Sequence, residues 1–167
     1  YKSTNGGASW AASNTGVGTN MAVEILMDPT DTSKLVAATK GGMYRSTNGG
    51  GNWTQVQSGA FTDMKAKPVA GGSQTLYAAT ATAFYYSTNF GATWTSTPVT
   101  LPAGNTGIRI AVSANDTSRV YLATTKGNGV VLKSTSSGTS FTQVYNSSSQ
   151  CIVCYNGGTT SGSQGNY

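Results

Sequence analysis

One eight-residue pattern occurs four times along this chain. It reads Ser-Thr-(Asn/Ser)-x-Gly-x-x-(Trp/Phe) and occupies residues 3–10, 46–53, 87–94 and 134–141. The first residues of successive copies are 43, 41 and 47 positions apart. A repeat of roughly forty residues, made of turn residues and short apolar runs, is typical of blade-built or stacked β architectures. The repeat therefore determines most of the expected fold.

Each copy, called a box from here on, combines residue types that favour a tight turn followed by a strand. The opening serine hydrogen-bonds back to the main chain, and the third residue accepts a backbone hydrogen bond or tolerates left-handed angles. The glycine supplies a positive φ, and the aromatic side chain is buried against the neighbouring unit. The box residues are Ser3, Asn5, Gly7 and Trp10; Ser46, Asn48, Gly50 and Trp53; Ser87, Asn89, Gly91 and Trp94; and Ser134, Ser136, Gly138 and Phe141.

The box resembles the Asp-box, or BNR repeat, of sialidases, sortilin-type propellers, xyloglucan-cleaving glycosidases and many secreted bacterial surface proteins. The family pattern is Ser-x-Asp-x-Gly-x-x-Trp, and this chain has Asn or Ser in place of the Asp. Asn and Ser also accept hydrogen bonds, so the turn is retained. The resemblance covers nearly the whole chain. It implies a β-propeller in which the box lies between the last two strands of a blade, away from the active site.

We therefore expect an all-β propeller of four-stranded antiparallel blades, with about four blades present and the set incomplete. The expected units of this single segment, 1–167, are about 1–14, 21–57, 60–99, 105–146 and 147–167. Within the three full units, the expected strands are 22–27, 35–39, 43–46 and 53–56; 64–68, 76–80, 84–87 and 94–97; and 108–112, 120–124, 130–134 and 141–144. We expect a fragment of a longer chain, with the remainder of that chain as its partner, unless its own ends meet as a four-bladed ring.

The composition argues against several classes of function. Only 9% of the residues are charged, the net charge is +5, and there is no His. The basic residues are spread singly, so we expect no nucleic-acid partner, and no apolar run is long enough for membrane insertion. Without His, a Ser-His-Asp triad and a His-ligated metal are excluded, and we expect no metal and no cofactor. The abundance of Ser, Thr and Asn favours a secreted or cell-surface protein.

The two cysteines, Cys151 and Cys154, form a CxxC pair. Such a pair can be a redox motif or half of a zinc site, but zinc would need two further soft ligands. A redox pair also favours a helix N-terminus, whereas the surrounding residues favour a strand. We therefore expect either a local disulfide or two small buried side chains.

A charged residue recurs on the first strand of each full unit. Counting back ten residues from Lys34, Thr75 and Arg119, which precede the second strands, reaches Glu24, Lys65 and Arg109. One interpretation is a ring of charge around the channel that binds an acidic or sugar ligand. The other is an interblade chain of ion pairs, with Glu24 beside Lys65 and Arg109 further round. The sequence is compatible with both interpretations.

The acidic residues favour binding over catalysis. Glycoside hydrolysis needs two carboxylates at a set separation across the bond. Of the five acids, Asp28, Asp31 and Asp116 are expected to cap turns, which leaves Glu24 and Asp63 as weak catalytic candidates. We therefore expect a non-catalytic module for binding, adhesion or scaffolding, with a glycan or surface-protein ligand. The alternative is part of a sialidase-like or xyloglucanase-like glycoside hydrolase whose catalytic acids lie mostly outside this segment.

Overall fold

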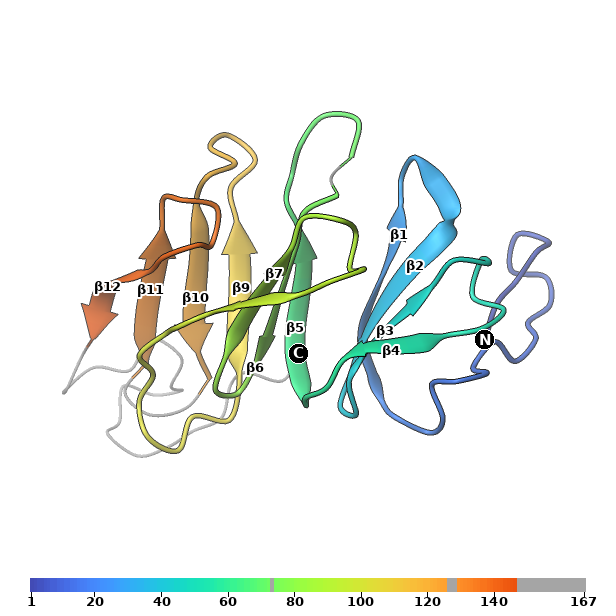
Figure 1. Cartoon of the computed structure of the whole chain (residues 1–167), viewed down its shortest axis with the longest axis horizontal. Coiled ribbons are helices and arrows are strands. Elements are labelled where there is room, and N and C mark those ends of the chain that lie inside the picture. Colours follow the sequence, from blue (N-terminus) through green and yellow to red (C-terminus); the bar gives the residue numbers. More distant parts are fainter. Residues whose placement is uncertain (73, 126–128, 147–167) are drawn as a thin grey trace.

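A computed structural model describes residues 1–72, 74–125 and 129–146, and this part of the chain contains three four-stranded antiparallel sheets and no helix. The three sheets are stacked side by side along the long axis (Figure 1). We call them the first, second and third blade. In order, they consist of β1 (Ala22–Asp28), β2 (Asp31–Thr39), β3 (Met43–Ser46) and β4 (Thr54–Gln57); β5 (Phe61–Ala66), β6 (Leu76–Thr80), β7 (Phe84–Ser87) and β8 (Thr95–Thr97); and β9 (Ile108–Val112), β10 (Val120–Thr124), β11 (Val130–Ser134) and β12 (Thr142–Asn146).

The expected all-β fold of four-stranded antiparallel blades is confirmed. Each sheet follows the order of its strands in the sequence. All twelve expected strands are present, although β2 begins earlier, at Asp31, and β5 begins at Phe61. Residues 1–14 form a separate N-terminal segment in which Lys2 bridges to Ala11 across the first box. The expected unit 147–167, with Cys151 and Cys154, lies outside the described residues.

Strand β1 differs from its expected pattern. Its alternation predicts Val23, Ile25 and Met27 on one face. Instead, the register shifts between Ala22 and Glu24, so Val23 packs with the second blade. The side chains of Ile25 and Met27 are 54% and 53% exposed. A β-bulge of this kind adds one residue to a strand and reverses the alternation beyond it.

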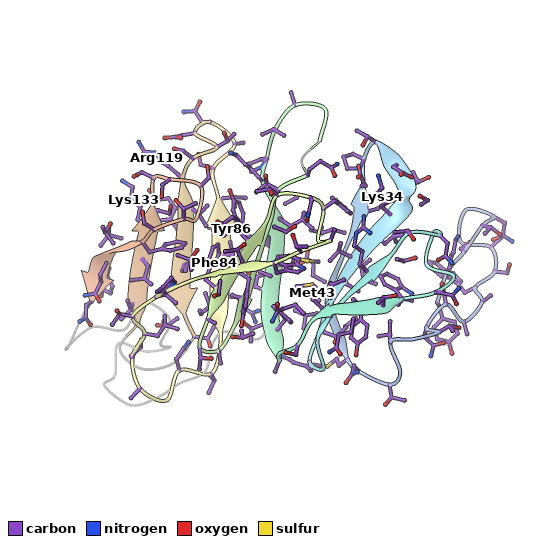
Figure 2. The ribbon with its side chains drawn as sticks, viewed as in Figure 1. Lys34, Met43, Phe84, Tyr86, Arg119 and Lys133 are labelled. Carbon is purple, nitrogen blue, oxygen red and sulfur yellow. The ribbon has the colours of Figure 1, made fainter. Side chains whose placement is uncertain are left out.

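The core consists of one layer between each pair of neighbouring blades and a smaller cluster of Ala37, Tyr44 and Trp53, against which Val17 packs. Strand β6 contributes to both layers because its side chains alternate. Leu76 and Ala78 pack with Met43 of the first blade, whereas Tyr77 and Ala79 pack with the third blade. Figure 2 labels Met43 and Phe84, one fully buried side chain from each layer. The blades are therefore held together by apolar faces, as stacked sheets require.

The box turns have one shared hydrogen-bond pattern. In every box the serine oxygen accepts the backbone N–H of the glycine four residues later, at 2.8 Å in the first box and 2.9 Å in the others. The oxygen of the third residue accepts the N–H of the seventh, as in the pair Asn89 and Thr93 (2.9 Å). In two boxes the amide nitrogen of the Asn also donates to the seventh residue's hydroxyl, on Ser9 or Thr93. Asn thus makes a bond that Asp cannot make.

The left-handed positions of the box differ from the expectation. None of the third residues has a positive φ. The fourth residue does in all four boxes, including Phe90 (φ 48°) and Ser137 (φ 54°), and so does the glycine that follows it. The third residue therefore contributes hydrogen bonds only. The left-handed backbone angles of the turn are adopted by the fourth and fifth residues.

The aromatic residue of the box is buried or half-buried in the full blades and exposed in the N-terminal segment. Trp53 is 9% exposed, and Trp94 and Phe141 pack against the two core layers. Trp10, in contrast, is 63% exposed. The predicted burial against a neighbouring unit therefore applies to three of the four boxes.

Candidate functional site

The strand register defines which charged residues occupy equivalent places. Glu24, Asp63 and Arg109 lie opposite Ala38, Ala79 and Ala123 of the second strands. Lys65 lies opposite Tyr77, two residues further along β5 and on the same face. The residue of the second blade that is equivalent to Glu24 and Arg109 is therefore Asp63, and not Lys65 as predicted.

The length of one turn explains this difference. Ala66 pairs with Leu76, ten residues on, whereas Val112 pairs with Val120, eight residues on. The turn between β5 and β6 is therefore longer by two residues. Counting a fixed number of residues back from the second strand ignores this extra length, whereas the strand register takes it into account.

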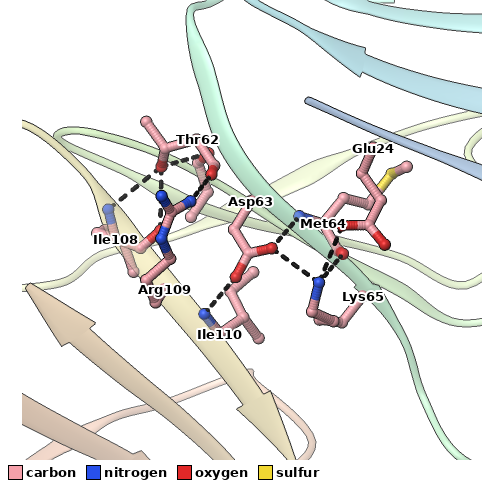
Figure 3. Close-up of polar contacts among 9 residues, drawn as sticks. Glu24, Thr62, Asp63, Met64, Lys65, Ile108, Arg109 and Ile110 are labelled. Atoms are coloured by element: carbon pink, nitrogen blue, oxygen red, sulfur yellow. Dashed lines mark hydrogen bonds and ion pairs between the residues drawn. The ribbon is translucent and has the colours of Figure 1, made fainter. Parts of the chain in front are cut away.

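The ammonium group of Lys65 is the centre of the charged cluster. Its Nζ lies 3.0 Å from Glu24 Oε2 of the first blade and 3.0 Å from Asp63 Oδ1 of its own strand. It also donates to the carbonyl oxygen of Met64 at 3.1 Å (Figure 3). Partial burial lowers the pKa of Lys65, but the hydrogen bonds from Lys65 to Asp63 and Glu24 outweigh that effect, and the pKa is raised overall.

Asp63 connects the second and third blades. It is 6% exposed, and its Oδ2 accepts the backbone N–H of Ile110 at 2.7 Å. Its Oδ1 accepts the N–H of Met64 at 2.9 Å in addition to the Lys65 ammonium. The carboxylate is therefore surrounded by donors from the protein, and it lies within the interface between the blades.

Thr62 and Arg109 extend the same connection. The Thr62 hydroxyl accepts the N–H of Ile108 at 3.2 Å and lies 3.1 Å from the Ile108 carbonyl oxygen. The Arg109 guanidinium donates to the carbonyl oxygen of Thr62 (Figure 3). Glu24 and Lys65 thus form the interblade ion pair, whereas Arg109 turns to the backbone of β5. Ligand binding by Glu24, Lys65 and Arg109 stays a prediction.

The other carboxylates cap turns, as expected. Asp28 is fully buried; its burial raises the pKa, but hydrogen bonds from Gln74 and Thr30 outweigh this, and the pKa is lowered. Hydrogen bonds from Ser33 and then Lys34 lower the pKa of Asp31 to about 2. Those from Ser118 and then Arg119 lower the pKa of Asp116 to about 2. Each carboxylate accepts the backbone N–H two residues later.

Two further observations concern metals and membranes. Within residues 1–72, 74–125 and 129–146, no three His, Cys, Asp or Glu side chains lie together in a way that would hold a metal ion. The same part of the chain includes no helix of the length and hydropathy needed to cross a membrane.

A groove that was not predicted from the sequence lies between the N-terminal segment and the first blade. It has a volume of about 420 Å³ and is lined by Trp10, Ile25, Met27, Leu35 and Trp53, with Lys2 at its edge. The indole of Trp53 donates to the carbonyl oxygen of Ser13 at 3.0 Å and so links the first blade to the N-terminal segment. The one available signal in the sequence was Trp10, the aromatic residue of a box that belongs to no full unit. The β-bulge that exposes Ile25 and Met27 has no such signal.

Comparisons with known proteins identify the fold. Neither a protein-family model nor a curated protein matches the chain. An ancestral GH74 enzyme superposes with a TM-score of 0.65 at 19% identity, over 79% of this chain and 19% of the enzyme. The GH74 enzyme of Niastella koreensis gives 0.52 at 26% identity, over 71% and 20%. YCF48 from Cyanidioschyzon merolae gives 0.51 at 12% identity, over 75% and 37%.

These similar structures are β-propeller proteins, and the chain has the same fold. It spans about a fifth of the length of the two GH74 enzymes and just over a third of that of YCF48. The described residues form an incomplete β-propeller.

Proposed function

We propose that this chain is a non-catalytic propeller module, secreted or on the cell surface, that binds a glycan or protein ligand. One observation carries the proposal. The Lys65 ammonium group forms ion pairs with both catalytic candidates, at 3.0 Å from Glu24 Oε2 and 3.0 Å from Asp63 Oδ1. The partners of the module are the remainder of its own propeller and the ligand.

The geometry of the two carboxylates opposes hydrolysis by this segment. A glycosidase holds its two carboxyl groups on opposite sides of the scissile bond, with room for substrate between them. Here the ammonium group of Lys65 lies between Glu24 and Asp63. Asp63 is also 6% exposed and accepts two backbone N–H groups. Neither carboxylate is placed to transfer a proton to a leaving group.

The groove beside Trp10 supports a binding role. Its lining is mostly apolar, and it includes the exposed residue Trp10 together with Lys2, whose amino group donates to the carbonyl oxygen of Gly49. Ligand sites combine such apolar walls with a few polar groups that fix orientation. Sugar rings and aromatic side chains of proteins both fit a surface of this kind.

A binding and turnover experiment tests the proposal. The chain is titrated with neutral and sialylated oligosaccharides by calorimetry, and released reducing ends are measured in the same samples. We expect binding that is lost in Trp10→Ala and kept in Val69→Ala, an exposed apolar control outside the groove, without release of sugar. Release that is abolished by Glu24→Gln or Asp63→Asn but unaffected by Asp31→Asn would overturn the proposal.

The second candidate function is part of a glycoside hydrolase. It is favoured by the superposition on two GH74 enzymes, of which the chain spans about a fifth. In this case the catalytic acids lie mostly outside the segment. The full-length protein would then release sugar, and its activity would persist in folded Glu24→Gln and Asp63→Asn variants. Absence of activity in the full-length protein on these substrates would count against this candidate.

A further inference from the structure

The residue before a box reaches the next box along the chain at two junctions. Lys2 precedes the first box, and its Nζ donates to the carbonyl oxygen of Gly49 at 2.7 Å. Arg45 precedes the second box, and its Nε donates to the carbonyl oxygen of Phe90 at 3.0 Å. Gly49 and Phe90 are the fourth residues of their boxes. A cation from one unit is thus bonded to the fourth residue of the next box.

The junction between the second and third blades lacks a basic residue at this place. Tyr86 precedes the third box, and it is half-buried against the apolar layer between these two blades (Tyr86 is labelled in Figure 2). A tyrosine side chain has no cationic group. The contact made by Lys2 and Arg45 therefore cannot be repeated here from the same position.

Lys67 supplies a cation at this junction from another part of the second blade. It directly follows β5, and its backbone N–H donates to the carbonyl oxygen of Thr75 at 2.9 Å, which extends the pairing of β5 with β6. Its Nζ donates to the hydroxyl oxygen of Ser137 at 3.1 Å. Ser137 is the fourth residue of the fourth box, so it occupies the same place as Gly49 and Phe90 in theirs.

The acceptor of Lys67 differs from the acceptors at the other two junctions. Those acceptors are backbone carbonyl oxygens, which every box has, whereas Lys67 is bonded to a side chain. The fourth residues of the four boxes are Gly6, Gly49, Phe90 and Ser137. A hydroxyl at this place therefore distinguishes the fourth box from the other three.

The turn that carries Ser137 is fixed from both blades. Ser137 has a φ of 54°, which is unusual for a residue other than glycine, and its N–H donates to the carbonyl oxygen of Ser118 in its own blade at 2.8 Å. From the second blade, Thr97 donates to the carbonyl oxygen of Gly138 at 2.7 Å. The hydroxyl of Ser137 is thus held in a defined place within reach of Lys67.

We infer that Lys67 and Ser137 form the contact by which the second blade recognises the fourth box. Lys67 replaces the basic residue that precedes the first and second boxes. Similar repeats in one chain can pack against the wrong neighbour, and a contact that one box alone can make opposes such pairing. The role concerns the order of the blades, and it is independent of the proposed ligand and of the groove.

A double-mutant cycle in the full-length protein tests the contact. Lys67→Met removes the ammonium group, and Ser137→Ala removes the hydroxyl but keeps a Cβ at the positive φ. Each should raise the unfolding equilibrium constant by about three- to tenfold, and the double variant should raise it no further than the larger single effect. Lys67→Arg should preserve stability. Lys40→Met, at an exposed lysine in the β2–β3 hairpin, is the matched control and should have no effect.

A third background tests whether the hydroxyl is what Lys67 recognises. Ser137→Gly gives the fourth box the same fourth residue as the second box. Lys67→Met should have no effect in this background, because the acceptor is absent. A full effect there would show that Lys67 binds the backbone of the turn, as Lys2 does, and that it does not distinguish the boxes.

Hydrogen exchange under native conditions supplies a local measurement. The N–H groups of Gly49, Phe90 and Ser137 are matched probes, since each donates to a carbonyl oxygen of its own blade at 2.8 Å. Lys67→Met should speed exchange at Ser137 by about threefold or more and leave the other two amides unchanged. Equal acceleration at all three amides would overturn the inference. So would single effects of Lys67→Met and Ser137→Ala that simply add, or an equal loss of stability in Lys40→Met.

Discussion

The carboxylate of Asp63 accepts the backbone N–H of Ile110, 2.7 Å away on the first strand of the next blade. Its other oxygen accepts the N–H of Met64 and lies 3.0 Å from the Lys65 ammonium, which also holds Glu24 of the first blade. One side chain therefore contributes to both junctions between the three blades. In a chain with only five acids, this placement makes Asp63 a structural residue.

Removal of this carboxylate should destabilise the fold strongly. In Asp63→Ala, the N–H groups of Ile110 and Met64 lose their acceptor inside the interface, and Lys65 loses one of its two carboxylates. A buried N–H left without an acceptor costs about 1–3 kcal/mol, so the two together should cost about 2 kcal/mol or more of unfolding free energy, and the partly exposed ion pair with Lys65 adds little. Urea denaturation measures the loss. Asp31→Ala is the control, because Asp31 also pairs with a lysine but is exposed in a turn; an equal loss in both variants would contradict the interpretation.

The glycine of the third box, Gly91, should be intolerant of any side chain. Its φ is 74°, and an added Cβ would lie 2.6 Å from Cγ2 of the buried Val36 in the first blade. Gly104 has a φ of 71° with nothing within 4 Å of such a Cβ. Gly104→Ala should therefore cost only the backbone strain, about 1 kcal/mol, whereas Gly91→Ala should cost about 1–3 kcal/mol more.

The double variant of Gly91→Ala with Val36→Ala separates the clash from the strain. The smaller residue at 36 removes the methyl group that the new side chain at position 91 would meet, so the two losses should not add. Thermal unfolding of the four proteins gives the comparison. Strict additivity, or equal losses for Gly91→Ala and Gly104→Ala, would show that the contact with Val36 has no energetic effect.

The opening serine of a box should matter in proportion to its burial. Ser46 is 1% exposed, and its oxygen accepts the N–H of the buried Gly50 at 2.9 Å. Ser3 makes the same bond to Gly7 at 2.8 Å on the exposed N-terminal segment. Ser46→Ala should cost about 1–3 kcal/mol because it leaves a buried N–H without an acceptor, whereas water can replace the hydroxyl in Ser3→Ala. Chemical denaturation distinguishes the two, and equal losses would contradict the role of burial.

The fold could be predicted from the sequence because the repeat encodes it several times over. Four boxes set the period, and alternating apolar residues between them set the strands, so an error in one unit is corrected by the others. The equivalence of Glu24, Lys65 and Arg109 had no such support. It depended on counting across one turn, and the two extra residues between Ala66 and Leu76 moved Asp63 into that place.

The candidate site was harder to predict for a related reason. Burial of Asp63 depends on how closely two blades approach each other. The spacing of residues within one blade does not predict that distance. Lys2 donates to the carbonyl oxygen of Gly49, and Arg45 donates to that of Phe90, in each case on the next box along the chain. These contacts had a visible signal, since a basic residue precedes three of the four boxes. That pattern becomes meaningful only when the next box is known to lie within reach of the side chain.

The turn carboxylates Asp31 and Asp116 should make stability fall in acid. Both have a pKa of about 2 in the folded chain, below the ordinary value of 3.8, chiefly because of hydrogen bonds from Ser33 and Ser118. A lowered folded pKa means that the unfolded chain binds protons first, so the contribution is complete above about pH 4 and is lost as the pH falls toward 2. The urea midpoint should therefore drop over this range. In the double variant Asp31→Asn and Asp116→Asn it should drop less, with the remaining slope partly due to Asp28, whose pKa is also lowered. The same pH dependence in both proteins would show that the two turns make no such contribution.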